Sequence, residues 1–99
     1  MKTVLIKYDV YNDLIECPDR IVDNFDDNIG GIFNWIENEP EGAKYKMVCP
    51  DSDEIGYWIN TDTVLEYLNS KCVGESEEKV RLVKANVSKR TKADYVTEF

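Results

Sequence analysis

The sequence predicts a single α+β domain with the element order β-β-α-β-β-α-β. Stretches in which apolar and polar residues alternate occur in two pairs, each joined by a short polar turn, and this pattern is typical of β-hairpins. Two other stretches carry apolar residues at intervals of three and four, which is the period of a helix. The chain has 99 residues, 42% of them apolar, so it has room for one core. We therefore expect an antiparallel or mixed sheet with two helices on one face.

The first hairpin is predicted over residues 3–17. Residues 3–11 are rich in β-branched and aromatic side chains and alternate in hydropathy, so one face of this strand is apolar. That face comprises Val4, Ile6, Tyr8 and Val10. Asn12-Asp13 suits a two-residue turn because both residues tolerate left-handed conformations. The returning strand ends at Pro18, which cannot donate to a strand ladder and suits the start of a helix.

Residues 19–38 are predicted to form the longer helix, around which the rest of the chain is organised. Its apolar stripe comprises Ile21, Val22, Phe25, Ile29, Ile32, Phe33 and Ile36. Acidic and amide residues lie between the stripe positions, so the opposite face is polar. Gly30-Gly31 weakens the helix, since an interior glycine costs up to about 1 kcal/mol relative to alanine. Because the stripe keeps its phase across the two glycines, we expect one helix with a bend, or close backbone packing there.

A second hairpin and a shorter helix follow an acidic loop. Residues 44–49 and 55–59 read as strands joined by a polar turn. Asn60 or Thr61 can cap a helix that runs from residue 62 to about residue 71. This helix has only about three turns, so it depends on packing against the sheet for stability.

The last predicted strand covers residues 79–87. Its alternation slips between Leu82 and Val83, which favours a β-bulge. We expect residues 1–88 to form the domain and residues 89–99 to be a basic-to-mixed C-terminal tail, either frayed or a short edge strand.

Charge is distributed unevenly along the chain, whose net charge is −8. Residues 9–66 contain fifteen acids and three bases, a net charge of −12, whereas residues 79–92 contain six bases and no acid. An acidic body repels phosphate backbones, so direct nucleic-acid binding over most of the surface is disfavoured. The basic stretch could bind nucleic acid alone, although a solvated strand face explains the same bases without a partner.

The sequence places the protein in the cytoplasm. No apolar run approaches the roughly 20 residues of a membrane span, and the N-terminal region lacks a secretory apolar segment. Three cysteines, Cys17, Cys49 and Cys72, are an odd number without a CxxC spacing, as expected of reduced thiols. They also leave a metal-binding or thiol-regulated protein open as a third hypothesis, although a zinc site needs about four ligands.

Few residues suggest catalysis. The chain has no histidine, so the usual general base and the Ser-His and Cys-His pairs are absent. The densest carboxylate groups, Asp26-Asp27 and the turn at residues 51–54, lie in polar stretches and lack the spacing of an EF-hand loop. We expect no enzymatic activity, no cofactor and no metal.

The acidic surface is the feature with the most functional content. We expect a non-enzymatic protein that binds a protein partner through a negatively charged face. In size and charge the chain resembles phage-encoded inhibitors of host nucleases and CRISPR effectors, which implies an inhibitor that mimics nucleic-acid charge and docks on a basic nucleic-acid-binding protein. The alternative is an interaction or homo-oligomerisation module that uses sheet edges and exposed aromatic residues. Acidity that serves solubility alone would explain the same charge without a partner. The predicted partner-binding residues are Asp19, Asp23, Asp26, Asp27, Glu37, Glu39, Glu41, Asp51, Asp53, Glu54, Tyr57 and Trp58.

Overall fold

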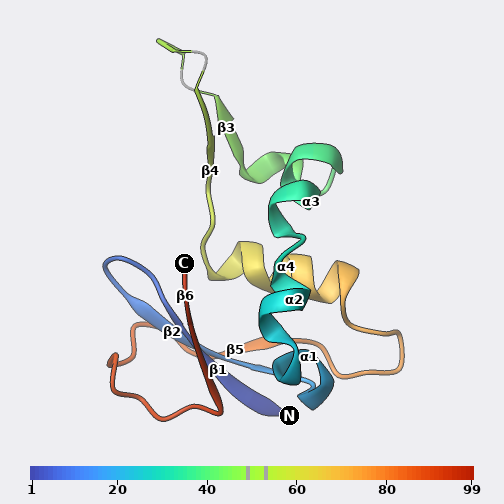
Figure 1. Ribbon diagram of the computed structural model, residues 1–99, viewed down its shortest axis with the longest axis vertical. Helices are drawn as coiled ribbons and strands as arrows, with labels where there is room; N and C mark the ends of the chain where they lie inside the picture. The colour runs from blue at the N-terminus through green and yellow to red at the C-terminus, as the bar shows by residue number, and fades with distance from the viewer. Residues whose placement is uncertain (49, 53) are drawn as a thin grey trace.

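The computed structural model describes residues 1–48, 50–52 and 54–99 and has an α+β architecture with two separate sheets (Figure 1). A four-stranded sheet, in the order β5-β2-β1-β6, contains β1 (Lys2–Lys7), β2 (Asn12–Cys17), β5 (Arg81–Lys84) and β6 (Tyr95–Glu98). A two-stranded sheet contains β3 (Lys46–Val48) and β4 (Ile55–Tyr57). The predicted α+β class and mixed sheet are confirmed. The second hairpin, however, forms a sheet of its own.

The four-stranded sheet is built around β1. This strand pairs antiparallel with β2, from Lys2 opposite Cys17 to Lys7 opposite Asn12, and parallel with β6. This register places Val4 opposite Ile15, and both side chains are buried in the core. The chain end that the sequence left as either frayed or an edge strand is thus an edge strand, β6.

The predicted turn of the first hairpin is wrong in position. Residues 8–11 form the turn, in which the Tyr8 amide donates to the Tyr11 carbonyl over 2.9 Å, and β2 begins at Asn12. Val10, predicted on the apolar face, is 90% exposed at the tip. Asp13 is buried in β2 because its carboxylate accepts hydrogen bonds from the Thr61 hydroxyl, at 2.5 Å, and the Asn86 amide, at 3.0 Å. These partners are distant in sequence, so local turn preference did not reveal them.

The predicted helix over residues 19–38 is three short helices in succession: α1 (Asp19–Asp23), α2 (Phe25–Ile29) and α3 (Ile32–Asn38). The first break lies at Asn24, whose φ of −130° and ψ of 41° are not helical. The second lies at Gly30-Gly31. The Tyr67 side chain approaches Gly31 so closely that a Cβ there would lie 2.5 Å from the hydroxyl oxygen. Close packing at the glycines is therefore present, with a side chain as the neighbour.

The core lies between the helices and one face of the four-stranded sheet (Figure 1). Helix α4 (Thr61–Lys71) follows Asn60, whose side chain accepts from the Thr63 amide at 3.1 Å, so the predicted cap is confirmed. Trp35 of α3, 1% exposed, packs against Tyr67 of α4, with ring centroids 5.6 Å apart. Five stripe residues of the first predicted helix are buried: Ile21, Val22, Phe25, Ile32 and Ile36.

Two smaller predictions concern β5 and membrane spans. The register of β2 against β5 shifts between Leu14, paired with Lys84, and Ile15, paired with Leu82, so the irregularity predicted at Leu82 and Val83 is present. Strand β5 itself is shorter than the predicted residues 79–87. Among the described residues, no helix combines the length and apolar character that crossing a bilayer requires.

Candidate functional site

The β3–β4 hairpin (residues 46–57) extends away from the body of the molecule (Figure 1). A short 3-10 helix, η1 (Ala43–Tyr45), leads into it from the end of α3. The apolar side chains of its strands are largely exposed: Val48 is 65% exposed and Ile55 50%. Met47 is exposed as well. Apolar residues that would form a core elsewhere thus lie on the surface here.

The base of the hairpin is firmly attached to the body. The Trp58 amide donates to the Tyr45 carbonyl over 2.7 Å, which continues the pairing beyond the strands. The Tyr57 ring packs edge-on against Phe33 of α3, with centroids 5.2 Å apart, and its hydroxyl donates to the Glu37 carboxylate. This hydrogen bond raises the pKa of Tyr57. The hairpin is therefore positioned by its base, while its strands and tip extend outward.

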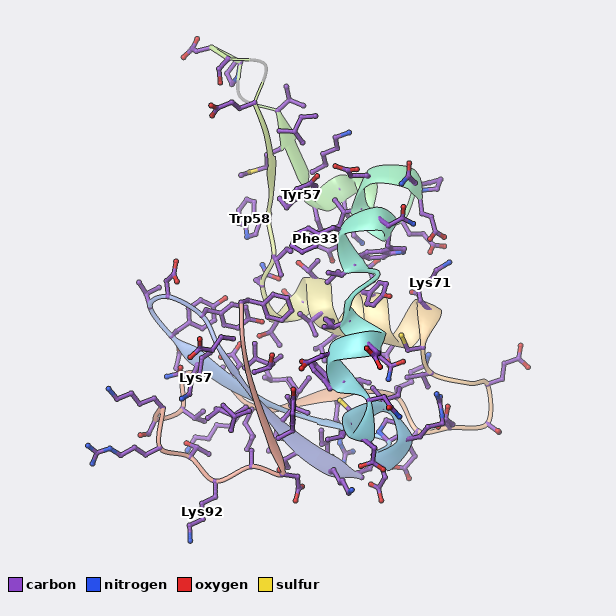
Figure 2. The ribbon with its side chains drawn as sticks, in the orientation of Figure 1. Lys7, Phe33, Tyr57, Trp58, Lys71 and Lys92 are labelled. Carbon is purple, nitrogen blue, oxygen red and sulfur yellow. The ribbon has the colours of Figure 1, made fainter. Side chains whose placement is uncertain are left out.

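The two predicted aromatic residues have different roles in this arrangement. Tyr57 and Trp58 are neighbours in an extended segment, so their side chains point to opposite sides. Figure 2 shows both at the base of the hairpin, with Tyr57 on the side of Phe33. Trp58 points away and is 59% exposed. Tyr57 thus anchors the hairpin to the body, whereas the Trp58 ring is exposed.

The outer edges of the two-stranded sheet are unpaired within the part of the chain that the structure describes. Strands β3 and β4 pair with each other through three residue pairs, from Lys46 opposite Tyr57 to Val48 opposite Ile55. Each strand therefore presents one edge of amide and carbonyl groups to the surroundings. Such edges can pair with a strand from another chain.

Three of the predicted acidic residues form ion pairs with basic groups. Asp19 lies 3.2 Å from the N-terminal ammonium, Asp23 lies 2.7 Å from the Lys2 ammonium, and Glu39 lies 2.6 Å from the Lys71 ammonium. These pairs are exposed and each is worth little in stability. They do, however, reduce the negative charge offered to a partner.

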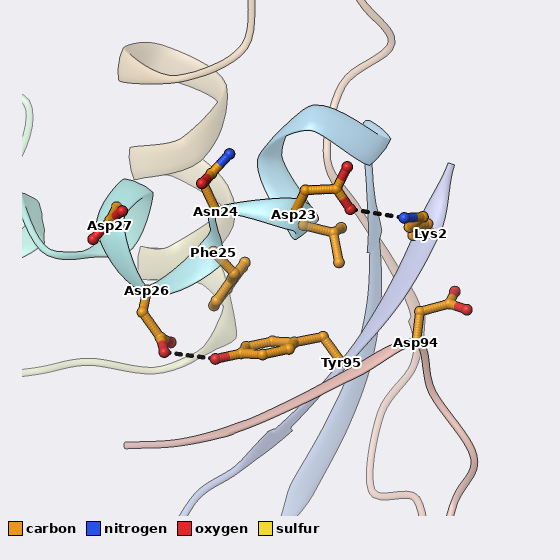
Figure 3. Close-up of a pocket in the computed structure, with 9 residues that line it drawn as sticks. Lys2, Asp23, Asn24, Phe25, Asp26, Asp27, Asp94 and Tyr95 are labelled. Atoms are coloured by element: carbon orange, nitrogen blue, oxygen red, sulfur yellow. Dashed lines mark hydrogen bonds and ion pairs between the residues drawn. The ribbon is translucent and has the colours of Figure 1, made fainter.

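Asp26 and Asp27 lie in a pocket of about 530 Å³ between α1, α2 and the start of β6 (Figure 3). Asp26 accepts a hydrogen bond from the Tyr95 hydroxyl at 2.6 Å. Asp94, at the same pocket, accepts from the Thr3 amide at 2.8 Å, and this bond holds the pKa of Asp94 below its ordinary value. With Asp23, four carboxylates and the Lys2 ammonium line the pocket.

The remaining predicted acids lie elsewhere. Glu37 and Glu41 lie at the end of α3 and in the loop after it, and Glu37 holds the Tyr57 hydroxyl. Asp51 and Glu54 are exposed near the hairpin tip, and Asp53 lies outside the described residues. The predicted acidic surface is therefore three groups: the pocket near α1 and α2, the end of α3, and the hairpin tip.

The cysteines are separated from these groups. Cys17 is fully buried in β2, where burial raises the pKa of its thiol to about 12. Cys72 is half-buried after α4, and burial also raises its pKa. Cys49 lies outside the described residues. Among the described residues, no three His, Cys, Asp or Glu side chains are grouped so that they could hold a metal ion.

Sequence reasoning missed the aromatic cluster of Tyr8, Tyr11 and Phe99. The Tyr8 ring stacks on Tyr11 at 4.5 Å and on Phe99 at 6.1 Å between centroids. The sequence around each of these residues indicated only a strand or the C-terminal tail. Their meeting depends on the parallel pairing of β1 with β6, which joins opposite ends of the chain.

Comparison with protein-family models, with curated proteins and with solved structures found no match to this chain. The functional inference therefore depends on the geometry of the residues described above.

Proposed function

We propose that this protein is a non-enzymatic interaction module that binds a protein partner through the β3–β4 hairpin. The observation that carries the proposal is the exposure of Met47, Val48, Ile55 and Trp58 on a two-stranded sheet that extends from the body. The register places Val48 and Ile55 on one face of the hairpin and Met47 and Trp58 on the other, so each face carries two neighbouring exposed apolar groups. Exposed apolar groups that lie close together mark interaction sites more often than exposed residues that are scattered singly.

The chemistry of the hairpin indicates the kind of partner. The strands offer apolar side chains and unpaired edges, and the tip adds the carboxylates of Asp51 and Glu54. A partner with an apolar groove and basic residues at one end would complement both. Burying the apolar groups would supply most of the affinity, since each square ångström removed from water contributes about 25 cal/mol before the costs of association. Pairing along a strand edge would set the register.

Two features support binding over catalysis. The chain has no histidine, and three of the four carboxylates in the pocket between α1, α2 and β6 are held by Lys2, Tyr95 and Thr3. The buried thiol of Cys17, whose pKa is raised to about 12, suits an unreactive role in a reducing cytoplasm.

The test is affinity capture with the tagged protein, quantified by mass spectrometry, from a lysate of the cells in which the protein is made. The variant Ile55→Ser with Trp58→Ser should lose the specific partner, and rising salt should have little effect on the wild-type capture. The matched control is Leu82→Ser with Val83→Ser, which removes two exposed apolar side chains from β5. If the hairpin variant captures the same proteins as the wild type, the proposal is wrong.

The acidic pocket favours a second candidate function. Asp23, Asp26, Asp27 and Asp94 line one pocket whose single lysine, Lys2, pairs with Asp23, and the net charge of the chain is −8. This arrangement supports docking on the basic surface of a nucleic-acid-binding protein, with inhibition by charge mimicry.

This second function predicts strong salt dependence. Asp26→Asn with Asp27→Asn should release the partner at lower salt than the wild type does, because fewer charge pairs hold the complex. Glu75→Gln with Glu78→Gln is the control, since both carboxylates are exposed beyond α4 and the net charge changes equally. Equal elution of both variants would rule out the charge mechanism.

A further inference from the structure

Three near-parallel aromatic rings lie at one end of the four-stranded sheet. The planes of Tyr8 and Tyr11 are inclined by 21°, and those of Tyr8 and Phe99 by 16°. The rings are held in place: the Tyr8 hydroxyl lies 2.9 Å from the Thr61 hydroxyl, and the Phe99 amide donates to the Lys7 carbonyl over 2.9 Å. The end of the sheet therefore carries a preformed aromatic platform.

This platform adjoins two hollows of different character. One, of about 460 Å³, is lined by all three rings together with Lys7 and Lys89, and also by Asp9 and Glu98. The other is lined by the same rings together with Phe33, Tyr57 and Ile59. A flat ligand on the rings would have ammonium groups on one side and apolar groups on the other.

The basic loop between β5 and β6 lies beside the platform. Hydrogen bonds between Val87 and Asn12, at 2.9 Å and 3.2 Å, attach this loop to the turn that carries Tyr8 and Tyr11. The exposed bases of the loop and its flanks are Lys84, Lys89, Arg90 and Lys92. Figure 2 shows Lys7 beside the four-stranded sheet and Lys92 further down on the loop that precedes β6, whereas Lys71 lies among the helices.

These loop bases differ from five of the eight other lysines and arginines. Lys2, Arg20, Lys44, Lys71 and Arg81 each form an ion pair with a carboxylate. Within residues 1–48, 50–52 and 54–99, no carboxylate lies within ion-pair distance of the four loop bases. A chain with an excess of acids thus keeps a row of unneutralised cations on this loop. The row begins at the rings with Lys89 and runs to Lys92, close to Asp94, which is bonded to Thr3 at the other end of β1.

We propose that this ring and loop surface binds a short single-stranded nucleic acid. The surface is defined by Lys7, Tyr8, Tyr11, Lys84, Lys89, Arg90, Lys92 and Phe99. Bases would stack on the rings exposed at the platform, and phosphates would follow the loop cations, which is how proteins hold single strands without reading sequence.

The charges of the molecule favour a single strand over a duplex. A duplex presents its phosphates on a broad surface and would meet the acidic body beyond the loop. A single strand can unstack its bases on the platform and keep its backbone on the loop side. Asp9 and Glu98 suit positions near the base edges, where carboxylates accept hydrogen bonds from the N–H groups of unpaired bases.

The first test is fluorescence anisotropy of a labelled oligothymidylate of about 12 nucleotides, a length within the range that one small domain covers. Binding should weaken steeply as salt rises from about 50 mM to about 200 mM. Lys89→Gln with Arg90→Gln and Lys92→Gln should lower the affinity about tenfold or more. The control, Lys44→Gln with Lys46→Gln and Lys71→Gln, removes the same number of charges elsewhere and should change the affinity less than about twofold.

The second test separates the rings from the charges. Tyr11→Ala should lower the affinity about tenfold and leave the salt dependence unchanged, because a lost stacking contact removes no ion pair. Tyr11→Phe should restore binding, since the ring remains. Thermal unfolding of each variant checks that the fold persists, and the loop variant tests the site independently if Tyr11→Ala unfolds.

Several outcomes would overturn the assignment. These are no binding of the oligothymidylate at low salt, equal binding of a duplex of the same length, and equal competition by inorganic polyphosphate of the same charge. The variant Ile55→Ser with Trp58→Ser should bind the oligothymidylate like the wild type, so this site and the hairpin function can fail separately.

Discussion

Apolar strand residues are buried in the body of the molecule but exposed in the β3–β4 hairpin. In β1, Val4 and Ile6 are fully buried, because they lie on the face of the sheet that the helices cover. In the hairpin, Val48 and Ile55 belong to equally apolar strands, yet half or more of each remains exposed. Alternating hydropathy predicts a strand in both regions. The two regions differ in whether a layer of helices covers the strand. This difference in burial is the observation on which the proposed binding role of the hairpin rests.

The largest expected effect comes from truncating one isoleucine in each region. Ile15→Ala should destabilise the protein by about 2–5 kcal/mol, because Ile15 is fully buried in β2 and leaves a cavity. Ile55→Ala should cost less than about 1 kcal/mol, because the side chain is half exposed. Urea unfolding measures both. Equal losses would show that the hairpin is part of the core.

A pair of glycines provides the next comparison. A Cβ on Gly42, between α3 and η1, would lie 2.4 Å from the Trp35 carbonyl oxygen, so Gly42→Ala should cost about 1–3 kcal/mol. A Cβ on Gly56 in β4 would meet only the Met47 methyl, at 3.9 Å. Gly56→Ala should therefore leave the midpoint of thermal unfolding nearly unchanged. A large loss at Gly56 would contradict the picture of an open hairpin.

Low pH should destabilise the folded protein, because it protonates Asp94. The Thr3 amide and hydroxyl hold the pKa of Asp94 below its ordinary value of 3.8, so the contact stabilises the fold fully above about pH 4. This contribution is lost as the pH falls below 4 and the carboxylate is protonated in the folded state. Asp94→Asn should lower the melting temperature at neutral pH and flatten its decline below pH 4. A variant whose melting temperature follows the wild-type curve at every pH would refute this.

The smallest expected effect on stability is at Trp58. Trp58→Phe should change the free energy of unfolding by less than about 0.5 kcal/mol, because the ring is largely exposed. It should also remove most of the fluorescence that acrylamide quenches, leaving the protected emission of the buried Trp35. If the quenchable emission persists in Trp58→Phe, the exposure of the two rings is not as described.

Part of the candidate sites followed from the sequence. Strand geometry required Tyr57 and Trp58 to point to opposite sides, and charge arithmetic identified both an acidic body and a basic stretch. Which ring would point outward was not determined, because that depends on Phe33 and Glu37 beneath the hairpin. The sequence also did not reveal that Lys2 neutralises Asp23, since the two residues meet only when β1 packs beside α1.

The sequence by itself determined the class of fold and the character of its parts. Periodicity identified hairpins and helices, and the bulge and the Asn60 cap were also legible, because each depends on residues close together in the chain. Only the tertiary structure decided the turn at residues 8–11, the division of the long helix, the separate second sheet and the pairing of β6 with β1. Periodicity states which face of an element is apolar, whereas long-range contacts determine what covers that face and which edges pair.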